Sequence, residues 1–149
     1  KKIINLSKKK NITCIILRSP AILGNNIYNN FVANLFLKLL RGEIPIIFNL
    51  NQYFNNIIHI STLNKVILKA IMTETNNNLY ILGSKNPIKI ITILKMISTI
   101  IQKKIDYKEG KRVSDNFLIN TRKIRKKNYE IITTKQTLRK YLLEFKDLS

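Results

Sequence analysis

Two kinds of hydrophobic pattern alternate along this chain of 149 residues. Short, continuous runs rich in isoleucine and leucine, bounded by asparagine, glycine or proline, predict β-strands at residues 12–17, 44–48, 57–60 and 79–82. Between these runs, apolar residues recur every three or four positions, which predicts amphipathic helices within residues 31–40, 63–71, 93–101 and 138–145. Strands that alternate with helices in this way indicate an α/β fold.

Two of the apolar runs should be neighbours in one sheet. Residues 12–17 and 79–82 are largely apolar, which is typical of parallel strands that are covered on both faces. We therefore expect adjacent or near-adjacent parallel strands, each with a helix packed against it.

The predicted helices carry signals at their ends. Gly42 stands where a glycine commonly ends a helix. Thr133 and Gln136 have the spacing of a capping box at the start of the last helix. Ser61 or Thr62 is expected to cap the helix after the 57–60 strand, because a hydroxyl oxygen accepts a free backbone N–H at that position.

Three short segments occur in a specific order: Leu17 to Gly24 (LRSPAILG), Phe54 to Ile60 (FNNIIHI) and Tyr80 to Pro87 (YILGSKNP). Their order and spacing resemble the back half of the extended short-chain dehydrogenases/reductases, whose members include NAD-dependent sugar-nucleotide epimerases and dehydratases. The resemblance implies the C-terminal part of a Rossmann-like α/β fold with a small α+β substrate-binding lobe. Residues 1–149 would then form the C-terminal, substrate-binding portion of such an enzyme, without its N-terminal dinucleotide-binding half.

The motifs of the family's front half are not found in the sequence. A turn that holds a dinucleotide pyrophosphate needs closely spaced glycines, whereas the four glycines here lie at positions 24, 42, 83 and 110. The family's catalytic Tyr-x-x-x-Lys pair is matched only by Tyr107 and Lys111, and Gly110 between them disfavours the helix that the pair requires. We therefore assign no catalytic residue and expect this chain alone to be inactive, with NAD or NADP bound mainly by the missing half.

The resemblance also implies which residues touch ligands. Those that it places beside the nicotinamide of the cofactor are Ser19, Pro20 and Ile22. Those that it places in the substrate pocket are Ala21, Asn30, Ile46, Phe48, Asn55 and Arg112. Two of these positions depart from the family, which has an asparagine where Ala21 stands and a diphosphate-binding arginine where Asn55 stands.

Several of these residues have a simpler alternative role. Asn30 is well placed to cap the helix that follows it, Phe48 is equally suited to a hydrophobic core, and Arg112 to a solvated surface. His59 lies between Ile58 and Ile60 in a predicted strand, where a structural role is the more common one. The composition offers no set of residues for a metal site, and the single Cys14 is expected to be an inert thiol in a strand.

The formal net charge of +19 favours a different function from the one that the motifs imply. Such an excess often indicates nucleic-acid binding, so a small basic nucleic-acid-binding module is the alternative function. The excess is mainly lysine and accompanies abundant isoleucine and asparagine, all residues of A/T-rich codons, and this origin weakens the argument. We therefore expect the partner to be a sugar nucleotide rather than nucleic acid or a membrane. We also expect a cytoplasmic location. The full-length protein is a candidate homodimer. The reaction itself, epimerisation, dehydration or reduction, stays open.

Overall fold

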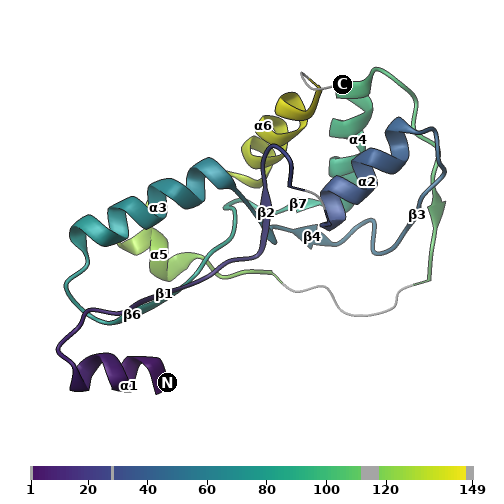
Figure 1. The fold of residues 1–149 in the computed structure, drawn as a ribbon. Helices are drawn as coiled ribbons and strands as arrows, with labels where there is room; N and C mark the ends of the chain where they lie inside the picture. The colour runs from purple at the N-terminus through teal and green to yellow at the C-terminus, as the bar shows by residue number, and fades with distance from the viewer. Residues whose placement is uncertain (1, 28, 112–117, 147–149) are drawn as a thin grey trace.

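The computed structural model describes residues 2–27, 29–111 and 118–146 (Figure 1). Its helices are α1 (Lys2–Lys9), α2 (Phe31–Leu40), α3 (Ile60–Thr73), α4 (Ile90–Ile101), α5 (Arg122–Lys126) and α6 (Thr134–Lys146). Its strands are β1 (Ile15–Arg18), β2 (Ala21–Leu23), β3 (Ile46–Ile47), β4 (Tyr53–Phe54), β5 (Ile57–His59), β6 (Asn78–Ile81), β7 (Ile88–Lys89) and β8 (Lys108–Glu109). No helix among these residues is long and apolar enough to cross a membrane.

Strands β1 and β6 pair in parallel, as the sequence predicted. Ile15 lies opposite Asn78, and Arg18 lies opposite Ile81. Helices α3 and α5 cover one face of this pair, where Leu17 and Tyr80 pack against both helices in one buried cluster. The predicted burial on both faces is wrong, because Ile16 and Leu79 are only partly buried and Ile81 is 45% exposed. The opposite face of this two-stranded sheet is therefore not closed by the described part of the chain.

Strands β2 and β5 also pair in parallel and lie between two hydrophobic clusters. Successive side chains of a strand point to opposite faces. Leu23 and Ile57 accordingly belong to a cluster with α2, α4 and α6, whereas Ile22 and Ile58 pack in the cluster with α3, β1 and β6. The two strands thus join the two halves of the core.

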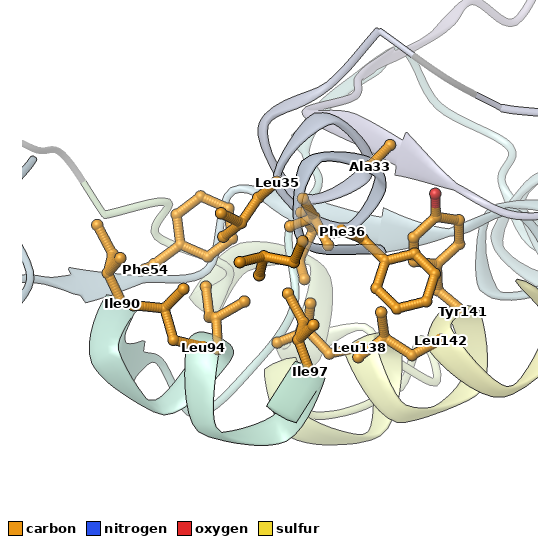
Figure 2. Close-up of a cluster of buried hydrophobic side chains, with 14 of the residues drawn as sticks. Ala33, Leu35, Phe36, Phe54, Ile90, Leu94, Ile97, Leu138, Tyr141 and Leu142 are labelled. Atoms are coloured by element: carbon orange, nitrogen blue, oxygen red, sulfur yellow. The ribbon is translucent and has the colours of Figure 1, made fainter. Parts of the chain in front are cut away.

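The first of these clusters is built mainly from three helices. Figure 2 shows Phe36 of α2 above Ile97 of α4 and Leu138 of α6, with Tyr141 and Leu142 beside them. All of these side chains are at most 1% exposed. The apolar spacing in the sequence therefore identified the buried faces of α4 and α6. It was less successful for α3, where Ile67 and Ile71 are 38% and 72% exposed because only the side of Val66 and Ala70 meets the sheet.

The helix caps follow local chemistry, with one exception. Thr133 and Gln136 form the predicted capping box, in which each side chain accepts the other residue's backbone N–H. The prediction of Ser61 or Thr62 as the cap of α3 is wrong. His59 is the cap, since its Nδ1 accepts the backbone N–H of Ser61 at 3.2 Å. Nε2 of the same ring lies 3.0 Å from the carboxylate of Glu144 on α6, so the histidine joins α3 to α6.

The carboxylate of Glu74 organises the far end of the β1–β6 sheet. Its Oε1 accepts hydrogen bonds from the hydroxyls of Tyr80 at 2.6 Å and Tyr129 at 3.0 Å, and its Oε2 accepts one from Asn78 Nδ2 at 2.8 Å. The bond from Tyr80, foremost, lowers the pKa of Glu74 against the opposing effect of partial burial. Burial, together with this carboxylate, raises the pKa of Tyr129 to about 12.

Replacement of Glu74 by glutamine should make stability less dependent on pH at acid pH. A carboxyl group whose pKa is lowered by folding adds stability above its unfolded pKa, near 4.3, and this stability is lost as the pH falls through the folded pKa. At pH 7 the variant should lose about 1–2 kcal/mol, since hydrogen bonds to a charged group become neutral ones. Urea unfolding between pH 3 and 7 measures both effects, with the exposed Glu43→Gln as control. Parallel pH profiles for wild type and Glu74→Gln would contradict the prediction.

Candidate functional site

A cavity of about 440 Å³ lies at the carboxyl ends of β1 and β6. Ligands of open parallel sheets commonly bind outside the carboxyl ends of the strands. Residues of several elements line it, since Ser19 and Pro20 connect β1 to β2, and Asn30 and Phe31 stand at the start of α2. The cavity is lined by Arg18, Ser19, Pro20, Ala21, Asn30, Phe31, Val32, Phe54, Asn56, Ile57, Ile81, Leu82 and Ile119.

Two asparagines that line this cavity each have a buried polar atom that no described residue partners. Asn30 Oδ1 accepts the backbone N–H of Ala33 at 2.9 Å and so caps α2, while Asn30 Nδ2 is buried and has no hydrogen-bond partner in the part of the chain that the structure describes. Asn56 Oδ1 is likewise buried without a partner. Because unsatisfied buried polar groups are rare in folded proteins, this donor and this acceptor indicate a site that binds a polar ligand.

The same end of the cavity favours negative charge. The N-terminus of the ten-residue helix α2 lies here, and the backbone N–H groups of Phe31 and Val32 have no partner within the helix. A helix N-terminus carries a partial positive charge that favours anions. Arg18 at the mouth of the cavity is exposed and forms no ion pair within 4.0 Å with a carboxylate of the described residues.

The remaining walls are mainly apolar. Phe54 is 8% exposed and lies with its ring centre 5.8 Å from that of Phe31, and Val32, Ile57 and Leu82 are fully buried behind the surface of the cavity. An apolar pocket with a few convergent polar groups is the usual form of a small-molecule site. This arrangement suits a ligand that combines flat or apolar surface with an anionic, hydrogen-bonding group.

Four of the predicted ligand-contacting residues meet at this cavity. Ser19, Pro20 and Ala21 form one wall, and Asn30 contributes from α2. The helix-capping role considered for Asn30 from the sequence is confirmed by its Oδ1, whereas its predicted contact with substrate stays a prediction for a residue that lines the cavity. Ile22 does not line the cavity, because the alternation of the strand turns its side chain into the second hydrophobic cluster.

Ile46 and Phe48 lie elsewhere, around strand β3. They are 59% and 42% exposed, so the alternative of Phe48 as a core residue is wrong. Both side chains pack over Gly110, where an added Cβ would come within 2.9 Å of Ile46 and 2.3 Å of Phe48. The two residues form an exposed apolar surface beside the β3–β8 pair, which is not part of the cavity lining. Their predicted contact with a nucleotide base stays a prediction.

Asn55 is a buried structural residue. Its Nδ2 donates to the carbonyl oxygens of Ser84 at 3.2 Å and Ile119 at 2.9 Å, and its Oδ1 accepts the N–H of Ile119 at 2.9 Å. Both amide hydrogens are thus used within the protein, and the residue is 2% exposed. The predicted contact of Asn55 with substrate gains no support from this arrangement and stays a prediction.

Sequence reasoning did not identify Asn56, and Arg112 lies outside the described residues. A signal for Asn56 existed in the family-like segment Phe54 to Ile60, but two adjacent asparagines cannot be told apart without knowing which one faces inward. Tyr107 and Lys111 are not one helical turn apart, because strand β8 lies between them. Among the described residues, no group of three or more metal-ligating side chains of the types His, Cys, Asp and Glu comes together.

Comparison with known proteins gives matches at the level of structure. No family model and no curated protein sequence matches the chain. The fold is similar to dTDP-glucose 4,6-dehydratase from Bacillus anthracis, solved with NAD (15% identity, TM-score 0.78, 97% of this chain and 48% of that one). It is also similar to UDP-N-acetylglucosamine 4-epimerase from Methanobrevibacter ruminantium, solved with UDP-N-acetylmuramic acid (16%, 0.79, 99% and 51%).

A third similar structure is UDP-glucuronic acid 4-epimerase from Bacillus cereus, solved with UDP-glucuronic acid and NAD (18% identity, TM-score 0.78, 99% of this chain and 50% of that one). The chain therefore spans about half the length of the structures that it matches. The predicted resemblance to sugar-nucleotide epimerases and dehydratases is confirmed as a resemblance of the fold.

Proposed function

We propose that this chain forms the substrate side of the active site of an NAD(P)-dependent enzyme that acts on a sugar nucleotide. The observation that carries the proposal is the cavity at the carboxyl ends of β1 and β6, with Asn30 Nδ2 unpartnered at the start of α2. A nucleotide diphosphate offers the anionic oxygens that this donor and the helix N-terminus would bind. The structural neighbours, which include complexes with UDP-sugars and NAD, support the same assignment.

The wall formed by Ser19, Pro20 and Ala21 fits the nicotinamide end of the cofactor. It lies at the carboxyl end of β1, is apolar apart from the hydroxyl of Ser19, and carries no side chain large enough to block a flat ring. A bound nicotinamide would supply the hydride acceptor and donor of the reaction. The residues of this chain would hold the diphosphate through Asn30, orient the sugar through Asn56 and exclude water with Phe31 and Phe54. A proton-transfer residue would have to come from outside the described residues of this chain.

The substitution Asn30→Asp should separate binding from stability. Aspartate keeps the oxygen that caps α2 and places negative charge at a helix N-terminus, so stability should stay equal or rise by a few tenths of a kcal/mol. The same change removes the Nδ2 donor and repels a diphosphate, so affinity for UDP-glucose or dTDP-glucose should fall by about tenfold or more. Isothermal titration and thermal unfolding of the protein measure the two effects.

Asn34→Asp is the matched control, because it adds the same charge to an exposed position on α2 that does not line the cavity. Equal loss of affinity in both variants would reveal only a general charge effect. Unchanged affinity in Asn30→Asp would remove Asn30 from the site.

The nucleic-acid alternative rests on the net charge of +19 and makes a different prediction. Binding to a phosphate backbone weakens steeply with salt, whereas a shaped pocket discriminates between bases and sugars. Titration of the protein with a single-stranded RNA oligonucleotide and with UDP-glucose, each at low and at high salt, measures the affinities that distinguish the two functions. Tight, strongly salt-dependent RNA binding without measurable sugar-nucleotide binding would favour the alternative and overturn the proposal.

A further inference from the structure

A second cavity is a groove on the outer side of α4 and α6, and none of its lining residues lines the first cavity. It has a volume of about 510 Å³ and is lined by Thr92, Lys95, Met96, Thr99, Ile100, Lys135, Arg139 and Leu143. The inner sides of the same helices are used for the core, since Leu94, Ile97, Leu138 and Leu142 point toward α2 (Figure 2). The groove is therefore a separate surface, and the proposed enzymatic function makes no use of it.

The groove has an apolar floor and a positively charged rim. Met96 and Ile100 are one turn apart on α4 and partly buried against the core, and Leu143 of α6 is 44% exposed. Exposed cations stand on both helices: Lys95 on α4, and Lys135 and Arg139 one turn apart on α6. None of these three cations forms an ion pair with a carboxylate of the described residues, and no carboxylate lines the groove.

The spacing of these side chains matches that of a helix. The lining residues of α4 run from Thr92 to Ile100, a length of about 12 Å. Lys135 and Arg139, four residues apart, can face carboxylates at positions i and i+4 of a partner helix that lies along the groove. An amphipathic helix bound by its apolar side in a hydrophobic groove is a common mode of peptide recognition.

A second copy of this chain does not fit the groove. Of its described helices, only α6 contains a carboxylate, the single Glu144, which already contacts His59. Each of the other described helices carries lysine, and α5 also arginine, so with the net charge of +19 two copies repel each other here. Charge complementarity therefore requires a partner of different composition.

We propose that the α4–α6 groove binds an acidic amphipathic helix of another protein, with the apolar side of that helix on Met96, Ile100 and Leu143 and its carboxylates at Lys95, Lys135 and Arg139. The apolar floor of the groove matches the apolar side of such a helix, and its cationic rim matches the carboxylates. The surface would link the protein to a partner without blocking the cavity at the carboxyl ends of β1 and β6.

The test uses labelled designed peptides and the purified protein. The acidic probe is an amphipathic helix of about five turns with leucine at i, i+3, i+4 and i+7 and glutamate at the flanking positions. One comparison peptide has lysine in place of glutamate, and another has the acidic composition in scrambled order. Fluorescence anisotropy should show binding of the acidic helix alone.

Charge reversal in the rim should then weaken binding specifically. Lys135→Glu/Arg139→Glu should raise the Kd for the acidic peptide by about tenfold or more, because two weak surface attractions become repulsions. The matched control Arg125→Glu/Lys126→Glu makes the same change in exposed residues of α5 and should leave the Kd within about twofold. Met96→Ser and Leu143→Ser, which keep the charge, should each weaken binding by a smaller factor.

Several results would overturn the proposal. Equal binding of the scrambled peptide, or equal loss in the α5 control, would mean general charge attraction. Binding of oleate at the groove without binding of the acidic peptide would identify an anionic amphiphile instead. A concentration-dependent dimer that Lys135→Glu/Arg139→Glu dissociates would identify a second copy.

Discussion

Replacement of Asn55 by leucine should destabilise the protein by about 3 kcal/mol, although the volume of the side chain hardly changes. The variant loses three hydrogen bonds and leaves the backbone groups of Ser84 and Ile119 without the partner that they have in the native fold. These bonds tie the connection between β4 and β5 to the segments after β6 and before α5. Urea unfolding of wild type and variant measures the difference.

The neighbouring substitution Asn56→Leu is the control for this prediction. Asn56 Oδ1 is buried without a partner at the cavity, so its removal should change stability by no more than about 0.5 kcal/mol or even raise it. The two variants thus separate a structural asparagine from one that is available to a ligand. Equal destabilisation by both substitutions would show that the two asparagines have the same role.

This chain by itself should self-associate through the open side of the β1–β6 sheet. The carbonyls of Cys14 and Arg18 accept hydrogen bonds from Asn78 and Leu82, so by alternation the backbone groups of Ile15 and Leu17 point away from β6. This edge adjoins the open apolar face with Ile16, Leu79 and Ile81. An unpaired apolar edge is a site for pairing with another chain, and the repulsion of the net charge is screened at high salt.

The variant Ile16→Lys/Ile81→Lys should lower self-association by about tenfold or more, because it places charge on that face. Ile71→Lys/Met72→Lys is the control, since it adds the same charge at exposed positions of α3, 72% and 82% exposed. Sedimentation velocity at several protein concentrations in about 0.5 M salt, where screening is strong, measures the effect. A wild-type chain that stays monomeric over the whole concentration range would contradict the prediction.

Local sequence was enough to predict the main elements and two of their caps. Asn30 and Thr133 act over three residues of their own chain, and the energy of such a cap does not depend on distant segments. The adjacency of β1 and β6 was predicted because both are short apolar runs in a family-like order of motifs. Ser19, Pro20 and Ala21, which the resemblance placed at ligands, line the cavity because they directly follow β1, and their contacts with ligand stay a prediction.

Other features depend on how distant segments meet. Asn55 and Asn56 are chemically identical neighbours, yet alternation in an extended segment turns one toward Ser84 and Ile119 and the other toward the cavity. His59 caps α3 in place of the expected Ser61 or Thr62, and Glu144 from the other end of the chain holds its ring.

Contacts between distant segments also decide which apolar side chains are exposed. Val66 and Ile67 are adjacent and similarly apolar, but only Val66 faces the sheet, so one is buried and the other is 38% exposed. The groove between α4 and α6 exists only because these two helices, far apart in sequence, pack side by side with their apolar sides toward α2 (Figure 2). Sequence alone therefore determined the elements and the caps of α2 and α6, since these depend on short-range chemistry, whereas the β1–β6 pairing joins segments far apart in the chain and was predicted from two apolar runs in a family-like order of motifs. Tertiary structure decided which polar atoms stay unpartnered and which apolar faces stay open, since burial depends on contacts between distant segments.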